Sequence, residues 1–267
     1  MNPYADFSPR ELRALIRAGK MTDITAGACA GYVQANLIVL PKRFADDFAE
    51  FARKNPKPCP VLDVTEPGDP HIYRLADRAD LSTDLPAYYV FENGERIGEF
   101  TDVRAYWRED MVGFLLGCSL SFETALIESG IRIRYIEEGR CSCGYRSNIP
   151  CEPAGVFSGP MVVSMRPVKP EQLALAYAVT ERFPHVHGGP VFHGDPREIG
   201  IRDIYAPEWG DPPTIGEGEI PVFWGCGITP QVMVEQLKPD LAISHKAGCM
   251  FVGDIRNAEL EEKLFSK

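Results

Sequence analysis

The stretch VGFLLGCSLSFETALIESG (residues 112–130) has a counterpart later in the chain, PVFWGCGITPQVMVEQLKP (residues 221–239). Each consists of an apolar run, a Gly-Cys pair and a helix-like pattern, and Gly117-Cys118 aligns with Gly225-Cys226. The repeat predicts two similar halves, each with a strand, a tight turn and a helix that starts beside a cysteine. Small anions bind readily at a helix N-terminus, where N–H groups are unpaired and the helix dipole is positive. The alternative is a chance match, since short apolar-Gly-Cys runs arise easily.

Composition restricts the class of protein. The chain has 267 residues, of which 45% are hydrophobic and 25% charged, as in ordinary globular proteins. Its net charge of -10 argues against nucleic acid and anionic membrane surfaces as partners, because both attract basic patches. A small carboxylate substrate and a homo-oligomeric state both remain compatible with it. No apolar run has the length of a membrane span, and the first twenty residues lack the apolar core of a signal peptide, so we expect a cytoplasmic protein.

Periodicity predicts alternating helices and strands. Ser8 can cap the first helix, and Asn93-Gly94 between apolar flanks indicates a hairpin over residues 88–100. Residues 104–116 fit a helical pattern, whereas the repeat predicts a strand directly before Cys118. Residues 141–160 show no periodicity and are expected to form a loop. The remaining helices are expected at residues 8–18, 42–53 and 170–182 and from Thr229, and the remaining strands at residues 32–40, 61–64, 131–136, 161–168, 220–224 and 241–244.

The alternation indicates an α/β fold, to which the hairpin adds antiparallel pairing. Beyond the repeated helices, Gly144 and Asn148 align with Gly253 and Asn257 without a gap. We therefore expect one two-lobed, mixed α/β unit over residues 1–267 with an internal pseudo-duplication. The approximate lobes are residues 20–148 and 149–257, with the chain free to cross between them.

The first candidate site residues lie at the repeated turn. A thiol near a helix N-terminus can have a lowered pKa, so Cys118 is a candidate nucleophile or acid/base. Ser119 or Ser121 is expected to cap the helix, and Ser121 is also expected to contact a substrate. The Glu123 carboxylate suits the first turn of the same helix. The alternatives are a small buried core thiol and a plain capping carboxylate.

The long irregular loop expected at residues 141–160 offers a possible carboxylate clamp. Tyr145, Arg146 and Asn148 place a phenol, a guanidinium and an amide close together in the chain. Arginine binds carboxylates through two parallel hydrogen bonds. We expect these side chains to contact a substrate carboxylate in a cleft between the lobes, which Cys118, Glu123 and His245 also line. The alternative is a surface segment whose side chains pair with their own neighbours.

Histidines supply the candidate proton carriers. His185, His187 and His193 lie within one segment next to Asp195, and they suit either a metal site or one general base with two bystanders, which we favour. His245 ends a predicted strand, where α/β proteins often place functional side chains.

Several cofactor and metal patterns are missing from the sequence. It has no phosphate-binding loop, dinucleotide fingerprint or nucleophile elbow. Of its eight cysteines only Cys141 and Cys143 lie close together, which does not match the spacing of a structural zinc site. We therefore expect free thiols, no metal and no cofactor.

Eight blocks of sequence together resemble the D-glutamate cyclase family, whose bacterial members are usually called hydro-lyases. The resemblance extends from about Thr25 to Asp254. It implies a two-lobed α/β protein that removes water from D-glutamate to give 5-oxo-D-proline, although family membership does not determine the substrate. The blocks are QANLIVLP (34–41), NPKPCPVLDV (55–64), STDLP (82–86), FLLGCSLSFE (114–123), YRSNIPC (145–151), GPMVVSMRP (159–167), GDPREIGI (194–201) and PVFWGCGITPQ (221–231).

That reaction requires groups for which the chain has candidates. The α-carboxylate needs a cation, for which Arg146 is a candidate, and the tetrahedral intermediate needs oxyanion donors. The backbone amides that follow Cys118 and Cys226 are candidates for those donors. Glu123, His245 or His187 are candidates for moving protons.

Other interpretations also remain open. Paired cysteines on two similar lobes suit a cofactor-independent racemase, and a non-catalytic protein that binds a small acid has the same composition. A metal-dependent lyase built on the histidine segment is a further alternative.

Overall fold

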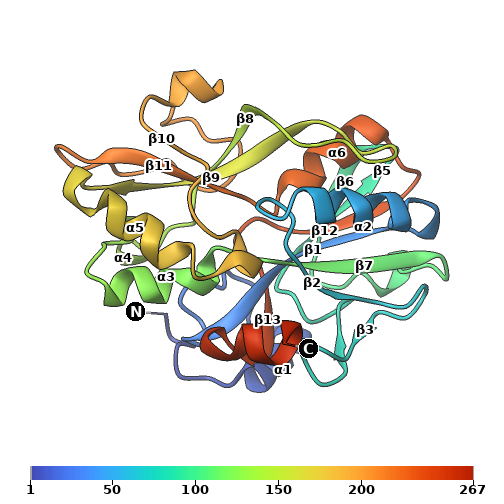
Figure 1. Ribbon diagram of the computed structural model, residues 1–267. Coiled ribbons are helices and arrows are strands. Elements are labelled where there is room, and N and C mark those ends of the chain that lie inside the picture. The colour runs from blue at the N-terminus through green and yellow to red at the C-terminus, as the bar shows by residue number, and fades with distance from the viewer. Residues whose placement is uncertain (1, 267) are drawn as a thin grey trace.

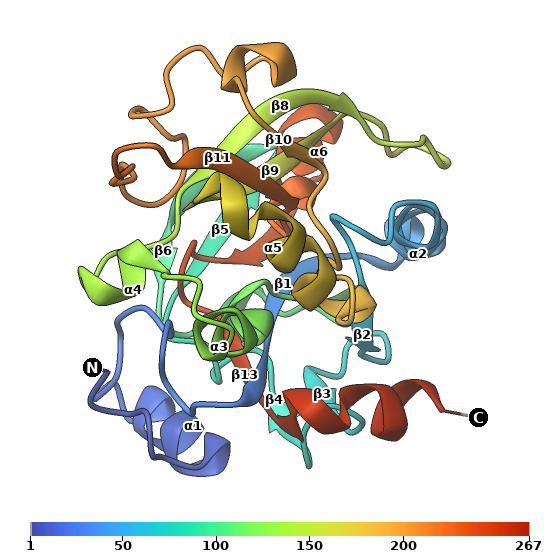
Figure 2. The same cartoon turned by 60° about the vertical axis from the view of Figure 1, so that its left-hand side comes forward.

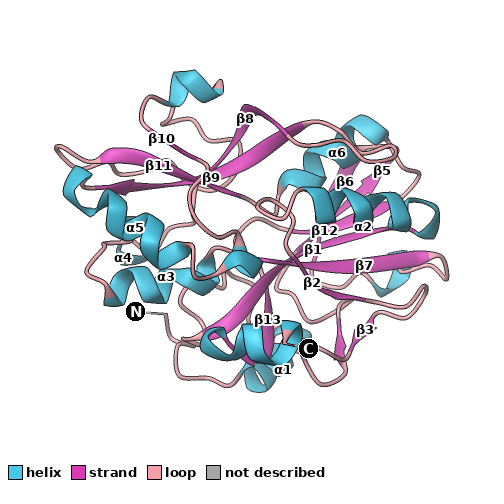
Figure 3. Cartoon of the chain, in the orientation of Figure 1, coloured by secondary structure: helices cyan, strands magenta, loops and turns pink. Residues whose placement is uncertain are grey.

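The computed structural model describes residues 2–266 and is built around two antiparallel sheets with helices packed on them (Figures 1 and 3). The larger sheet has the strand order β2-β7-β1-β12-β5-β6, and β13 pairs with β1 off this path. Its strands are β1 (Tyr32–Pro41), β2 (Val61–Val64), β5 (Tyr88–Glu92), β6 (Glu95–Phe100), β7 (Met111–Gly117), β12 (Ala242–His245) and β13 (Phe251–Arg256).

The second sheet lies across the upper part of the molecule in Figure 1 and has the order β10-β11-β9-β8. Its strands are β8 (Gly144–Pro150), β9 (Pro160–Val168), β10 (Phe192–His193) and β11 (Ile220–Gly225), and a separate small pair comprises β3 (His71–Ile72) and β4 (Ala79–Asp80). All strand pairs in the described part of the chain are antiparallel. The mixed α/β class is confirmed, but the rule that places ligands beyond parallel strands does not apply here.

The helices are mostly short. The α-helices are α1 (Pro9–Arg17), α2 (Ala45–Lys54), α3 (Leu120–Glu128), α4 (Arg134–Glu137), α5 (Leu173–Thr180) and α6 (Thr229–Leu237). Single turns of other helix types are η1 (Lys42–Phe44), η2 (Arg104–Tyr106), η3 (Pro170–Gln172), η4 (Pro184–Val186), η5 (Pro196–Ile199), η6 (Asn257–Glu259) and η7 (Glu261–Phe265). Ser8 caps α1 in a reciprocal arrangement with Glu11, as its sequence predicts. Between residues 2 and 266, no helix combines the length and apolarity needed to cross a membrane.

The repeat in the sequence is a repeat in the structure. Strand β7 leads through Gly117-Cys118 into α3, and β11 leads through Gly225-Cys226 into α6. Helix α3 packs against β1, and α6 packs against β9. The strand pairings also match: Ala35 of β1 lies opposite Gly117, and Val163 of β9 lies opposite Gly225. We therefore treat β1-β7-α3 and β9-β11-α6 as equivalent units.

The two halves exchange strands. Strand β8 follows α3 in the chain but pairs with β9, and β13 follows α6 but pairs with β1 (Figure 2). Tyr145 lies opposite Val163 and Phe251 lies opposite Ala35, so these two aromatic residues are equivalent. The sequence alignment of Gly144 with Gly253 is therefore wrong by three residues. Because neither sheet is a continuous stretch of chain, the division into lobes at residues 148 and 149 stays a prediction.

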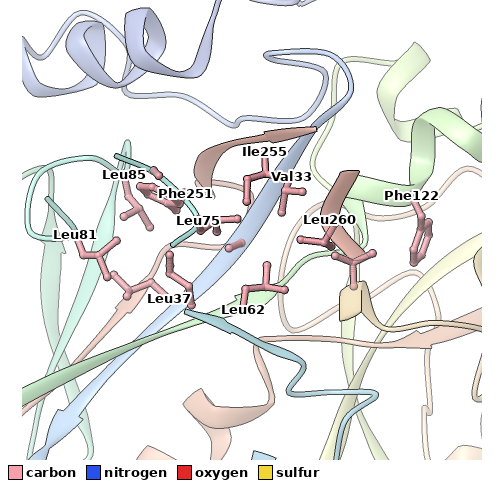
Figure 4. Packing of buried hydrophobic residues seen from close by; sticks show 14 of the residues in the cluster. Val33, Leu37, Leu62, Leu75, Leu81, Leu85, Phe122, Phe251, Ile255 and Leu260 are labelled. Atoms are coloured by element: carbon pink, nitrogen blue, oxygen red, sulfur yellow. The ribbon is translucent and has the colours of Figure 1, made fainter. Parts of the chain in front are cut away.

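Strand β1 runs through the middle of the hydrophobic core. Val33, Leu37 and the residues alternating with them pack into one cluster, which Figure 4 shows together with Phe251 of β13. Ile38 and Leu40 point to the opposite face and join a second cluster. A strand that is buried on both faces needs apolar side chains at almost every position, which explains why most residues of β1 are apolar.

Three local predictions were wrong. Residues 111–117 form strand β7 rather than the end of a helix, because they pair with β1 along their whole length. Residues 131–136 form no strand and lead into α4. The segment 141–160, expected to be a loop, contains β8. By contrast, the Asn93-Gly94 hairpin is confirmed, with both residues at positive φ as its tight turn requires.

Candidate active site

The two Gly-Cys turns face one cavity between the sheets. The cavity has a volume of about 50 Å³. The cavity is therefore narrow and suits a small ligand. Residues from both halves line it, among them Asn36, Cys118, Ser119, Tyr135, Ser164, Cys226 and His245.

Glycine precedes each cysteine because another backbone packs against it. A Cβ atom on Gly117 would lie 2.1 Å from the carbonyl oxygen of His185. A Cβ atom on Gly225 would lie 2.8 Å from the carbonyl oxygen of Lys57. Any side chain at these positions would push away the packed backbone, so glycine is needed for the close approach of His185 to Gly117 and of Lys57 to Gly225.

Matching hydrogen bonds hold the two turns. The Cys118 N–H donates to the Gln34 carbonyl over 3.0 Å, and the Cys226 N–H donates to the Val162 carbonyl over 2.9 Å. In return, the Gln34 N–H donates to Ser121 Oγ and the Val162 N–H donates to Thr229 Oγ1. Ser121 was predicted to contact substrate or to cap α3. Its hydroxyl instead ties α3 to β1, and it does not line the cavity of the two cysteines.

Both thiols are protonated at neutral pH. Burial raises the pKa of Cys118 to about 12 and that of Cys226 to about 11. The N–H groups of Leu120 and Ile228 donate to the two sulfurs and oppose this effect only in part. The expected lowering of the Cys118 pKa is thus wrong, because desolvation outweighs the helix N-terminus. A neutral thiol suits proton donation better than attack as a thiolate.

His245 brings an imidazole to the same cavity. It is 1% exposed, and its Nδ1 lies 3.2 Å from both the N and the O of Leu37. Its Nε2 is buried without a hydrogen-bond partner among residues 2–266. Burial lowers the pKa of His245 to about 4, so the ring is neutral at pH 7 and can accept a proton.

Two backbone donors are left without acceptors at equivalent places. Within residues 2–266, neither the N–H of Ser119 nor that of Gly227 donates a hydrogen bond. Both residues are buried, and each directly follows one of the two cysteines. Ser119 lines the cavity, and Gly227 lies between Cys226 and Ile228, which also line it. Buried N–H groups are almost always paired, so these two unpaired donors indicate a place for a ligand oxygen.

A buried charged network forms part of the cavity wall. Arg166 of β9 is 1% exposed, and its Nη2 lies 2.5 Å from Oε1 of Glu123 on α3. The same guanidinium donates to Ser119 Oγ over 2.7 Å and to Ser164 Oγ over 2.8 Å, and the hydroxyl of Tyr135 donates to Glu123. Burial disfavours the charge of Arg166, but the adjacent Glu123 carboxylate outweighs it and the pKa of Arg166 is raised.

Sequence reasoning missed Arg166 and Ser164. A signal was present, because an arginine inside the apolar run PMVVSMRPV (160–168) is a rare buried charge that requires a partner. Glu123 was expected as a proton carrier or capping carboxylate. In the structure it is that partner and holds the network together, and it does not line the cavity itself.

The predicted carboxylate clamp does not face the cavity. Arg146 is paired with Glu235 over 2.6 Å and stacks over Trp209 at the surface. The Tyr145 hydroxyl donates to the Ile204 carbonyl, and Asn148 is exposed. The expectation that these residues share one cleft with Cys118 is therefore wrong. Along β8 successive side chains point to opposite faces, and their partners come from distant segments.

The histidine segment does not assemble into one site. His187 is buried and its Nδ1 donates to the Lys57 carbonyl, away from the cavity lining, which does not fit the expected role in proton transfer. His185 stacks on Phe265, whereas His193 contacts Tyr177. Because the three rings have three separate sets of partners, they do not converge on a metal ion.

Comparison with known proteins identifies the family of this chain. The family model described as D-glutamate cyclase matches residues 112–254, which contain both Gly-Cys turns, β8, β9, α3 and α6. A Geobacillus kaustophilus protein named "Putative hydro-lyase GK2103" is 53% identical over 96% of this chain and 97% of its own. "Putative hydro-lyase YcsI" of Bacillus subtilis is 52% identical over 95% and 98% of the two chains, and "Putative hydro-lyase" of Stutzerimonas stutzeri is 49% identical over 97% and 98%. The chain belongs to the D-glutamate cyclase family.

Proposed function

We propose that this protein is a hydro-lyase that cyclises D-glutamate to 5-oxo-D-proline with loss of water. The observation that carries the proposal is the cavity between the two Gly-Cys turns. It combines a neutral imidazole, neutral thiols and unpaired backbone N–H groups, which are the groups that a dehydrating ring closure requires. The family's description as D-glutamate cyclase supports this substrate, and the names of the relatives support only the loss of water.

The reaction moves two protons from the substrate nitrogen to the carboxyl oxygen that leaves as water. The His245 imidazole takes the first proton from the ammonium group, and the Cys118 thiol donates a proton to the carboxyl oxygen. The amine nitrogen then attacks the side-chain carboxyl carbon and closes the ring. The Cys118 thiolate takes the second nitrogen proton, and the protonated His245 supplies the second proton to the departing oxygen. Both groups thus return to their starting states.

The tetrahedral intermediate carries negative charge on one oxygen. The N–H groups of Ser119 and Gly227 are the donors for it, since both lack acceptors and lie at helix N-termini. Such donors contribute to the rate because they are already oriented before the charge develops. Removing a donor of this kind from other enzymes costs about 10²–10³ in kcat.

Incubation of the purified protein with D-glutamate or L-glutamate, followed by mass spectrometry, tests the proposal. We expect loss of one water and formation of 5-oxoproline, faster from the D enantiomer. Folding is checked by thermal unfolding in the same buffer. A folded protein that removes water from neither enantiomer would contradict the proposal.

One observation favours a second candidate function. Cys118 and Cys226 occupy equivalent positions on the two halves and line the same cavity, as two-base racemisation of an amino acid requires. In that reaction one thiolate removes the α-hydrogen and the opposite thiol returns one to the other face. Incorporation of deuterium at the α-carbon in deuterated water would indicate racemisation. Cyclisation without exchange would indicate the first function.

A further inference from the structure

Arg166 contacts the cavity only through other side chains. Its guanidinium donates from Nη1 to Ser164 Oγ, and from Nη2 to Ser119 Oγ and Glu123. Ser119 belongs to the first half and Ser164 to the second, so one buried arginine holds a hydroxyl on each side. In the equivalent position of the other half, the β1 register places Ile38, which cannot do this.

The hydrogen bonds from Arg166 leave the hydroxyl hydrogens of Ser119 and Ser164 free to be donated to a ligand. A serine hydroxyl has one hydrogen to donate and two lone pairs to accept with. In both residues Arg166 occupies a lone pair, and neither hydroxyl donates to any acceptor among residues 2–266. Both residues line the cavity, so a bound molecule is the natural acceptor for their hydrogens.

The charge balance of the wall indicates what that molecule is. No Lys, Arg, Asp or Glu lines the cavity within the part of the chain that the structure describes. The N–H of Ser119 and the hydroxyls of Ser119 and Ser164 are donors on this wall that have no acceptor among residues 2–266. A wall rich in neutral donors binds an anion with several oxygens, and a carboxylate is the simplest such group.

We propose that Ser119 and Ser164, oriented by Arg166, form the subsite for the α-carboxylate of the substrate. This inference rests on the proposed cyclisation, in which the N–H groups of Ser119 and Gly227 bind the other, reacting carboxyl group. Arg166 is a positioning residue here, since it acts through the two serines. It replaces Arg146, which the sequence favoured as the cation for this carboxylate.

Binding of glutarate tests the subsite. Glutarate has two carboxylates and no amine, so it cannot cyclise, and its affinity is measured by calorimetry. We expect Ser119→Ala and Ser164→Ala each to weaken glutarate binding about tenfold or more, as loss of a hydrogen bond to a charged group does. The same variants should raise KM for D-glutamate more than they lower kcat. Ser147→Ala is the matched control, because Ser147 is also buried but donates to the Met161 carbonyl away from the cavity.

The positioning role of Arg166 needs a variant that folds. Arg166→Met alone leaves Glu123 buried without its partner, whereas Arg166→Met with Glu123→Leu replaces the ion pair by apolar groups. We expect the double variant to weaken glutarate binding about tenfold although both serines are present, because their hydroxyls can now rotate. Wild-type affinity in the double variant would overturn the role of Arg166.

The outcomes separate this inference from the proposed function. Glutarate binding that depends on both serines, without any cyclisation of D-glutamate, would support the subsite and contradict the cyclase. Cyclisation with unchanged KM in both serine variants would support the cyclase and overturn the subsite. Failure of the wild-type protein to bind glutarate would also overturn the subsite.

Discussion

The two Gly-Cys turns have the same backbone and different surroundings. Cys118 and Cys226 have matching hydrogen bonds, and a glycine packed against a foreign carbonyl precedes each. After Cys118 comes Ser119, bonded to Arg166, whereas after Cys226 comes Gly227, packed against Asn36. A duplicated backbone unit can therefore build a site in which the two halves contribute different side chains.

The helices that follow the turns differ in the same way. Glu123 on α3 is matched on α6 by Gln231, which is neutral. Glu123 pairs with Arg166, whereas the Gln231 side chain donates to the His245 carbonyl over 3.1 Å. Helix α3 thus supplies the carboxylate of a buried ion pair, and α6 supplies a neutral hydrogen bond to His245. A dicarboxylic amino acid has two different ends, and a cavity whose two halves carry different side chains can distinguish them.

The two cysteines are the sharpest test of this difference. In the cyclase, Cys118→Ala should lower kcat about 10²–10⁴-fold, the usual contribution of a general acid/base, whereas Cys226→Ala should cost less than about tenfold. In a racemase both variants should lose activity equally. Steady-state kinetics on D-glutamate decides between them. Cys151→Ala, which removes a buried thiol away from the cavity, should leave kcat and KM unchanged.

Stability should respond to the ion pair far more than to the amide. We expect Arg166→Met to lower the free energy of unfolding by about 3–5 kcal/mol, because it leaves Glu123 charged and buried. Gln231→Leu should lower it by only about 1 kcal/mol, the net contribution of a neutral hydrogen bond. Urea unfolding measures both. Equal losses would show that the two halves are energetically alike.

His187 and His245 should both affect the pH dependence of stability, but only His245 should affect catalysis. Burial lowers the pKa values of both His187 and His245 to about 4. Between pH 6.5 and 4 the unfolded chain therefore binds more protons than the folded one, and stability is lost as the pH falls through this range. Each histidine accounts for up to about 3 kcal/mol of this loss.

Replacing either ring by asparagine should flatten the pH dependence of unfolding between those limits. Only His245→Asn should also lower kcat/KM, by about 10²–10⁴-fold, since His187 does not line the cavity. Urea unfolding over a pH series and kinetics at pH 7 give the two readouts. A comparable loss of kcat/KM in His187→Asn would return that residue to the mechanism.

The smallest effect is expected at the clamp predicted from sequence. Arg146→Lys should keep the surface ion pair with Glu235, change stability by less than about 1 kcal/mol and leave KM for D-glutamate unchanged. A clear increase in KM would bring β8 back to the substrate and weaken the case for Ser119 and Ser164.

Features that depend only on residues close together in the sequence were predicted correctly. The Ser8 cap, the Asn93-Gly94 turn and the helix that begins at Thr229 were all predicted correctly, because capping, turn geometry and helical periodicity act over three or four residues. The two Gly-Cys turns were found for the same reason, since each is a strand, a turn and a helix start within one short segment. Cys118, Cys226 and His245 entered the candidate site from these local patterns.

Only the tertiary structure decided the pairings. Residues 111–117 became a strand and segment 144–150 joined the opposite half because their backbone partners lie far away in the chain. The same holds for charges: Arg146 met Glu235 at the surface, and Arg166 met Glu123 in the interior, across contacts that no local spacing reveals. Burial reversed the expected acidity of the Cys118 thiol, because desolvation depends on everything packed around a group. Local sequence specifies the turn, and long-range packing determines which side chains reach the cavity and in which protonation state.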